Sequence, residues 1–145
     1  VVYEANQKAI SAVIEGNNIM EPQKISEKVI VSGLVNLGIL KGDPDELYNA
    51  GAHKEFYMHK VGHWLGLDVH DSGDYMEDGD FMSFKPGMVT TVEPGIYISS
   101  SSNVDEKWKG IGIRIEDDIL VTESGNLNLT EKVPSDPKEI EALMS

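Results

Sequence analysis

Residues 110–121 read GIGIRIEDDILV, and the alternation within this stretch decides the fold. Successive side chains of a strand point to opposite faces, so one face carries three isoleucines: Ile111, Ile113 and Ile115. The other face carries Arg114 and Glu116 beside a glycine, which indicates either an exposed ion pair or the lining of a polar site. Asp117 and Asp118 follow at once and favour the polar site, because adjacent carboxylates repel one another unless a cation or hydrogen-bond donors compensate.

Strand character extends in both directions from this stretch. Residues 86–99 (PGMVTTVEPGIYIS) and residues 122–130 (TESGNLNLT) combine β-branched and aromatic side chains with glycine and proline punctuation, which is typical of strands and hairpins. A polar loop is expected from Ser99 onward, where four serines stand in a row.

Helical spacing of apolar residues predicts two helices before the strands, over residues 1–16 and from about Pro22 to the glycines at 38 and 42. Residues 42–52 are rich in turn formers, with room for one short helical turn, and a last short helix begins at about Pro137. Helices followed by consecutive strands predict an α+β fold with a largely antiparallel sheet, rather than βαβ units. A chain of 145 residues corresponds to one domain.

Three of the four histidines crowd into residues 59–71, HKVGHWLGLDVHD. They are structural histidines, metal ligands or proton-transfer groups. His59 and His63 have the spacing of a helical zinc-protease motif, but that motif needs Glu directly after the first histidine, where this chain has Lys60. Glycines also interrupt a helix here, and LGLDVHD alternates as a strand. We therefore expect the histidines, His70 included, to reach a site from a turn and a strand.

Within residues 86–99, Glu93 ends a run of β-branched residues, and Pro94 after it favours an extended conformation. Taken alone, Glu93 is either a surface residue beside a turn or a stiffly held ligand or base. Together with the imidazoles, Glu116 and Arg114, it forms a constellation of nitrogen and oxygen donors without sulfur. Such a donor set suits Mn, Co, Fe or Zn in a hydrolytic site, often as a pair of ions.

The composition agrees with an enzyme that needs cations. There are 25 acidic and 12 basic residues, a net charge of −13, and no cysteine. The charge argues against nucleic-acid and anionic-membrane partners, although a solubilising surface explains it equally well. Disulfides, thiolate metal sites and cysteine nucleophiles are excluded. We expect a cytoplasmic protein.

Three motifs in this order, HKVGHWLGLDVHD, PGMVTTVEPGIYI and GIGIRIEDDILVTESGNLNLT, resemble the catalytic half of the Xaa-Pro aminopeptidases (aminopeptidase P). That family belongs to the pita-bread metallopeptidases. The resemblance implies a partial pita-bread fold, with a curved antiparallel sheet and flanking helices. It also implies that residues 1–145 are the C-terminal portion of one catalytic domain whose N-terminal part is missing.

Position by position, the resemblance implies that the metal ligands are His63, Glu93 and Glu116, the last bridging two ions. It places His59 and His70 at the substrate, Arg114 as an orienting group, and Tyr97 in the outer shell. The implied reaction removes the N-terminal residue before proline by means of a hydroxide that bridges two divalent ions, with manganese expected, and Glu93 passes the proton on. The implied partners are peptides with proline at position two and, in a homo-oligomer, further copies of the chain.

The family has two further aspartate ligands on an upstream strand, and this chain offers only Asp43 and Asp45 in a turn. We therefore expect an incomplete site and a chain that is inactive or binds metal weakly. Two alternatives stay open: a prolidase, which takes only Xaa-Pro dipeptides, and a non-catalytic pita-bread protein that binds peptides.

Overall fold

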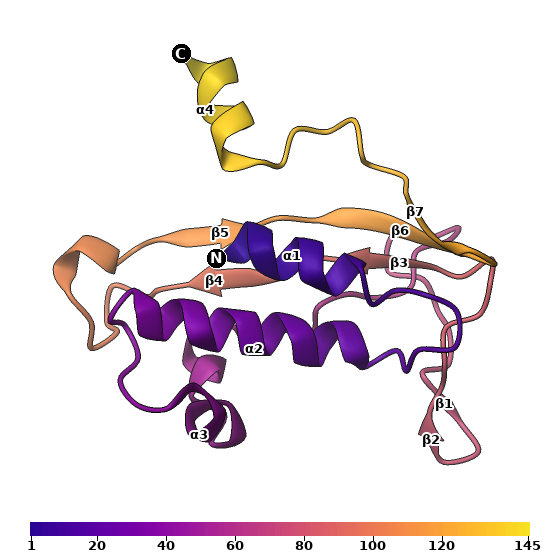
Figure 1. Ribbon diagram of the computed structural model, residues 1–145, viewed down its shortest axis with the longest axis horizontal. Helices are drawn as coiled ribbons and strands as arrows, with labels where there is room; N and C mark the ends of the chain where they lie inside the picture. The colour runs from indigo at the N-terminus through magenta and orange to yellow at the C-terminus, as the bar shows by residue number, and fades with distance from the viewer.

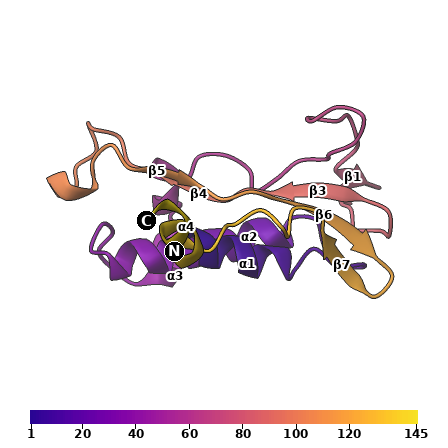
Figure 2. The ribbon, with the colours of Figure 1, turned by 90° about the horizontal axis from the view of Figure 1, so that it is seen from above.

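The computed structural model describes all 145 residues as a layer of strands with helices against one face (Figures 1 and 2). Every strand pair is antiparallel, which confirms the expected α+β class. None of the helices combines the length and the apolar composition that a membrane span requires.

Helix α1 (Val2–Ile10) and helix α2 (Glu21–Asn36) lie side by side against the strands (Figure 2). The first helix is shorter than the expected 1–16, because turns replace the helix after Ile10. The second agrees with expectation: Pro22 stands in its first turn, and the left-handed Gly38 follows its end. α3 (Pro44–Asn49) and the short helix η1 (Ala52–Glu55) then occupy the turn-rich stretch.

The strands form a broken ladder. β3 (Val89–Val92) pairs with β6 (Asp117–Thr122), which pairs with β7 (Gly125–Asn128), while β4 (Gly95–Tyr97) pairs with β5 (Gly112–Arg114). The short helix η2 (Glu106–Trp108) lies in the polar loop between β4 and β5. The expected single strand over residues 110–121 is therefore divided into β5 and β6.

One register runs through both halves of this ladder. Val92 faces Asp117 in the first pairing, and Gly95 faces Arg114 in the second. Counting inwards from either pairing places Glu93 opposite Glu116. The break in the strands therefore falls at the two glutamates.

The expected strand over LGLDVHD is wrong. Leu67 is fully exposed and Val69 is 70% exposed, so the alternation has no core to face. The stretch that pairs with β3 lies earlier, at residues 61–65. There Val61 O accepts from Glu93 N (2.6 Å), His63 O accepts from Thr91 N (3.0 Å), and Leu65 N donates to Val89 O (3.1 Å).

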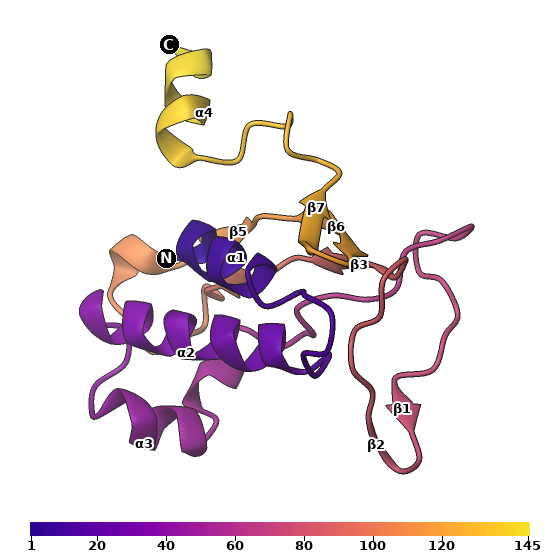
Figure 3. The same ribbon diagram turned by 45° about the vertical axis from the view of Figure 1, so that its right-hand side comes forward.

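A hairpin of β1 (Met76–Glu77) and β2 (Asp80–Phe81) was not anticipated, although Asp78–Gly79 between the two strands is a strong hairpin signal. Both residues have positive φ, as such a turn requires. The last helix, α4 (Pro137–Met144), begins where expected, is capped by Asp136, and stands away from the sheet (Figures 1 and 3).

The core lies between the helices and the sheet, in two clusters. The larger fully buried side chains include Ile30, Leu34, Phe56, Val92 and Ile119. Burying one such side chain contributes about 1.5–3 kcal/mol. Because Val92 and Ile119 face this core, strand alternation turns Glu93 and Glu116 to the opposite face.

Candidate metal centre

Three of the expected residues come together at the break in the ladder. One ligand atom from each of His63, Glu93 and Glu116 lies within 4.8 Å of the other two. His63 belongs to the segment beside β3, and each glutamate follows or precedes a strand end. The sheet register alone places the two carboxylates opposite each other, where like charges are unfavourable.

The charged form of Glu116 is unfavourable in this arrangement. Burial raises the pKa of the Glu116 carboxyl, and the charges of Glu93 and Asp118 raise it further, whereas His63 and Arg114 oppose this shift. A divalent cation between the carboxylates would remove the repulsion. One imidazole and two carboxylates are donors that Mn²⁺, Zn²⁺, Co²⁺ and Fe²⁺ accept, so the residues present fit a metal ion of this class.

The Glu93 side chain is only 9% exposed, and its carboxylate is held from several sides. Oε1 lies 3.3 Å from His63 Nε2 and accepts from Thr91 Oγ1 at 3.2 Å. Oε2 lies 3.0 Å from Arg114 Nη1. Arg114, which the resemblance implies as an orienting group, therefore contacts the Glu93 carboxylate directly.

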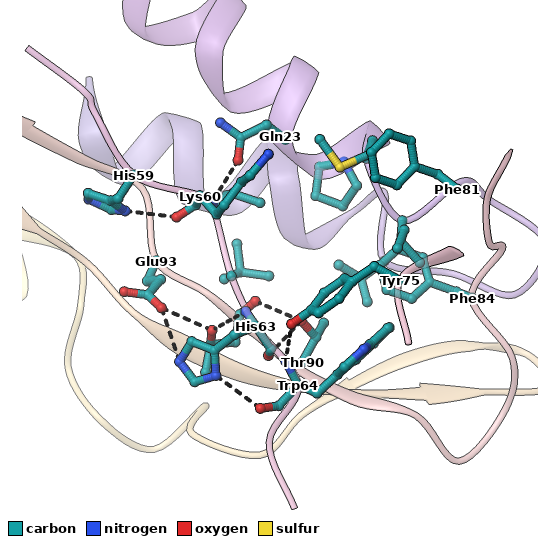
Figure 4. Close-up of a pocket in the computed structure, with 18 of the residues that line it drawn as sticks. Gln23, His59, Lys60, His63, Trp64, Tyr75, Phe81, Phe84, Thr90 and Glu93 are labelled. Atoms are coloured by element: carbon teal, nitrogen blue, oxygen red, sulfur yellow. Dashed lines mark hydrogen bonds and ion pairs between the residues drawn. The ribbon is translucent and has the colours of Figure 1, made fainter. Parts of the chain in front are cut away.

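The ring of His63 has a defined tautomer. Its Nδ1 lies 3.0 Å from the carbonyl oxygen of Trp64, which can only accept, so Nδ1 carries a proton. In the neutral ring, the lone pair is then on Nε2, the atom that faces Glu93 (Figure 4). A backbone carbonyl on the other ring nitrogen is the usual support of a metal-binding histidine.

His59, Tyr97 and Arg114 form a chain of hydrogen bonds that leads to Glu93. His59 Nδ1 lies 2.7 Å from Lys60 O, and its Nε2 lies 3.0 Å from Tyr97 Oη. Arg114 Nε donates to the same hydroxyl oxygen at 2.6 Å, which raises the pKa of the guanidinium. Tyr97 therefore accepts from Arg114 and donates to His59.

The ring of His70 packs edge-on against the ring of His63, with 4.4 Å between centroids. Five of the expected residues line a cavity of about 510 Å³: His59, His63, His70, Glu93 and Arg114. Glu116 and Tyr97 join this site through the contacts described above. Asp43 and Asp45 do not belong to the site. Asp43 caps α3 by accepting from the N–H groups of Asp45 and Glu46.

Sequence reasoning missed the apolar end of the cavity. Trp64, Tyr75, Phe81 and Phe84 gather there (Figure 4). Trp64 stacks on Tyr75 with 5.2 Å between centroids. The Asp78–Gly79 turn could have indicated this feature, because the turn reverses the chain and brings the residues after it back to the apolar end of the cavity.

Sequence reasoning also missed two residues that hold the segment of His59 and His63 in place. Gln23 of α2 is buried, and its Oε1 accepts from Val61 N at 2.5 Å. A side chain at Gly62 would place Cβ 1.9 Å from Thr91 O, so only glycine allows this segment to pair with β3. The glycine that appeared to interrupt a helix is instead required for close approach.

Comparisons with known proteins agree with this geometry. The sequence profile of metallopeptidase family M24 matches residues 1–123. The chain is 52% identical to the Xaa-Pro aminopeptidase of Escherichia coli over 144 residues, and 50% identical to that of Haemophilus influenzae over 145. These alignments cover 99% and 100% of the chain, and 32% and 34% of the relatives.

Solved structures give the same result. Aminopeptidase PepP of Pseudomonas aeruginosa superposes with a TM-score of 0.96 at 51% identity, covering 99% of this chain and 33% of that one. Aminopeptidase P from E. coli with the inhibitor Pro-Leu gives 0.93 at 52% identity, covering 99% and 32%. The expected partial pita-bread fold is confirmed, and the chain spans about a third of the length of the relatives that it matches.

Proposed function

The chain belongs to metallopeptidase family M24, and from this premise we propose that it carries part of the active site of an Xaa-Pro aminopeptidase. The observation that supports the proposal most directly is the cluster of His63, Glu93 and Glu116, which provides ligands for a divalent metal. A pair of ions, with manganese as our proposal, would supply an activated water and polarise the scissile carbonyl.

Each of the expected site residues has a proposed role in this reaction. Glu93 would take a proton from the attacking water and pass it to the prolyl nitrogen, and Glu116 would be a ligand of both ions. Arg114, 3.0 Å from Glu93 Oε2, holds this carboxylate in place. His70 donates a hydrogen bond to the carbonyl oxygen as negative charge develops there. His59 contacts the substrate, and Tyr97 holds its ring through Nε2.

The full ligand set requires residues beyond these. Neither Asp43 nor Asp45 is part of the cluster, and both lie at the start of α3. We propose that two aspartates outside the 145 residues complete the site, so that the chain alone is inactive or binds metal weakly. A cytoplasmic location and a homo-oligomeric state remain predictions.

The test is hydrolysis of an Xaa-Pro-Xaa tripeptide with added Mn²⁺. The chain would be compared with a version extended upstream to the length of its relatives, each with a Glu93→Gln control. Cleavage by the extended form alone supports the proposal. Cleavage by the 145 residues would contradict the account of the ligands, and cleavage of Xaa-Pro dipeptides only would identify a prolidase. Metal and peptide binding without cleavage would identify the non-catalytic alternative.

A further inference from the structure

Asn6 of α1 is fully buried, and its amide nitrogen lies between two backbone carbonyls of the sheet. Nδ2 is 3.0 Å from Val92 O and 3.5 Å from Ile115 O. Val92 directly precedes Glu93, and Ile115 directly precedes Glu116. One side chain therefore contacts the backbone immediately before both glutamates of the cluster.

The chemistry of the ladder explains why a donor is needed at this point. The register that pairs Val92 with Asp117 and Gly95 with Arg114 sets Ile115 opposite Pro94. Ile115 N donates to Pro94 O at 3.4 Å, but proline has no N–H to return the bond. The Ile115 carbonyl lacks its ladder donor, and the Asn6 amide stands in for it.

The amide is itself oriented. Oδ1 of Asn6 accepts from Gln7 Nε2 at 2.9 Å, so both Nδ2 hydrogens point to the strands. The neighbours of Asn6 on the buried face of α1 are apolar: Val2, Ala5 and Ala9. Burying an amide on such a face is unfavourable unless the amide is hydrogen-bonded. The contacts with the two carbonyls therefore offset the cost of burying Asn6.

We infer that Asn6 is a positioning residue for the metal centre. By holding the carbonyls of Val92 and Ile115, it sets the backbone from which Glu93 and Glu116 project, and keeps the two carboxylates at a separation that one cation can span. The inference rests on the proposed function, since it concerns the same two ligands, but it concerns the helix on the other face of the sheet.

The chain contains a matched control. Asn126 of β7 uses its Nδ2 in the same way, donating to Ile10 O at 2.8 Å and to Val13 O at 3.0 Å. It supports the end of α1 and contacts neither glutamate. Replacing either asparagine by leucine removes one amide and two carbonyl contacts while keeping the number and branching of the side-chain heavy atoms.

The experiment measures Mn²⁺ affinity of the full chain by electron paramagnetic resonance, with thermal unfolding measured in parallel. Asn6→Leu should weaken Mn²⁺ binding about 10- to 100-fold, the range for residues that orient metal ligands. Asn126→Leu should lower the unfolding temperature comparably and leave the affinity unchanged. Equal affinities for Asn6→Leu and the parent would overturn the inference while leaving the proposed metal site intact.

Hydrogen exchange of the metal-free chain provides a readout that does not depend on metal. Asn6→Leu should speed exchange locally, at the amides of Glu93, Ile115 and Glu116, whereas Asn126→Leu should not. If the 145 residues bind Mn²⁺ too weakly to measure, as an incomplete ligand set allows, the affinities are compared in the extended form, and the exchange pattern of the 145 residues decides the role of Asn6 without metal. If the extended form also binds no Mn²⁺, the proposed metal site fails, and the exchange pattern still decides the role of Asn6. Exchange that rises evenly over the sheet would identify Asn6 as a general stabilising residue.

A second substitution tests the cause. Pro94→Ala gives residue 94 an N–H that can donate to Ile115 O, so adding it to Asn6→Leu should restore part of the lost local protection. If it restores none, the missing ladder donor is not the reason for the amide. Should Asn6→Leu fail to fold, Asn6→Ser replaces it, because serine removes the amide donors and keeps a polar group.

Discussion

Arg114 Nη1 lies 3.0 Å from Glu93 Oε2, whereas no basic side chain forms an ion pair with Glu116. Arg114 lowers the cost of burying Glu93. The pKa of the Glu116 carboxyl is raised by desolvation and then by the negative charges of Glu93 and Asp118. The two opposed glutamates are therefore unequal: one is held by protein, and the other is left for a cation.

Replacing Arg114 by lysine keeps the positive charge but loses the guanidinium fork that reaches both Glu93 and Tyr97. We expect Mn²⁺ affinity, and peptide hydrolysis by the extended form, to fall about 10- to 100-fold. Because Arg114 is 44% exposed, stability should change by less than about 1 kcal/mol. Lys85→Gln, which breaks the exposed pair with Glu77, is the control and should change neither. Parental affinity in Arg114→Lys would mean that charge alone is sufficient.

Glu116→Gln should stabilise the metal-free chain at neutral pH. The folded-state pKa of Glu116 is raised above its ordinary value of 4.5, so the charged carboxylate is the form that the fold disfavours. Stability contributed by this group is complete below pH 4.5 and is lost as the pH rises through the folded-state pKa.

The gain from Glu116→Gln at pH 7 should be less than about 1 kcal/mol, because Glu116 is exposed to solvent, which screens the repulsion. Thermal unfolding in the presence of a chelator, at pH 7 and at pH 4, checks this: the two proteins should differ at pH 7 and converge at pH 4. The same variant should lose Mn²⁺ binding. A substitution that destabilises the chain at pH 7 would show that Glu116 has a favourable partner when ionised.

Gln23→Met should loosen the histidine segment. It leaves the N–H of Val61 without its acceptor, and an unsatisfied buried group costs about 1–3 kcal/mol. Beyond that loss, we expect weaker Mn²⁺ binding, because Val61 lies between His59 and His63. Ser26→Ala, one turn along α2, removes a bond to the Gln23 carbonyl and should lower stability without changing metal affinity. Equal effects of the two variants on metal affinity would contradict this role.

Gly62→Ala and Gly112→Ala form a pair of opposite expectations. At Gly62 a Cβ would lie 1.9 Å from Thr91 O, so the segment must move away from β3, at a cost of about 1–3 kcal/mol or more. At Gly112 the nearest atom would be Tyr97 Cδ1 at an ordinary 3.5 Å. We expect Gly62→Ala to unfold at lower temperature and to lose Mn²⁺ binding, and Gly112→Ala to retain both. Tolerance of alanine at position 62 would show that the pairing beside β3 can be given up.

The sequence alone was sufficient for the fold class, the two long helices and the residues that meet at the site. Helical spacing of apolar residues predicted the helices, alternation in residues 110–121 and the Glu-Pro-Gly turn indicated the strands and the two glutamates, and the family resemblance implied the role of each site residue. The sequence was insufficient where the structure of a segment depends on which other segment lies beside it. LGLDVHD has the alternation of a strand, yet Leu67 and Val69 are exposed because no strand lies beside them.

The supports of the site were also beyond sequence reasoning. Asn6 and Gln23 interrupt the apolar faces of their helices, and helical periodicity can only register them as polar exceptions. Their purpose depends on carbonyl and amide groups of residues far away in the chain, Val92 and Val61. Tertiary hydrogen bonds of this kind leave no local signal.

The common register of the two strand pairs has a consequence for chain length. Inserting or deleting one residue between Val92 and Gly95, or between Arg114 and Asp117, would shift the pairing by one and turn a glutamate to the face covered by α1. The loop from Ser99 to Gly110 does not set this register, although its residues Val104 and Trp108 pack against the core. Within this hairpin, substitutions can be compensated by neighbouring side chains, but the spacing of the glutamates from their strands cannot change.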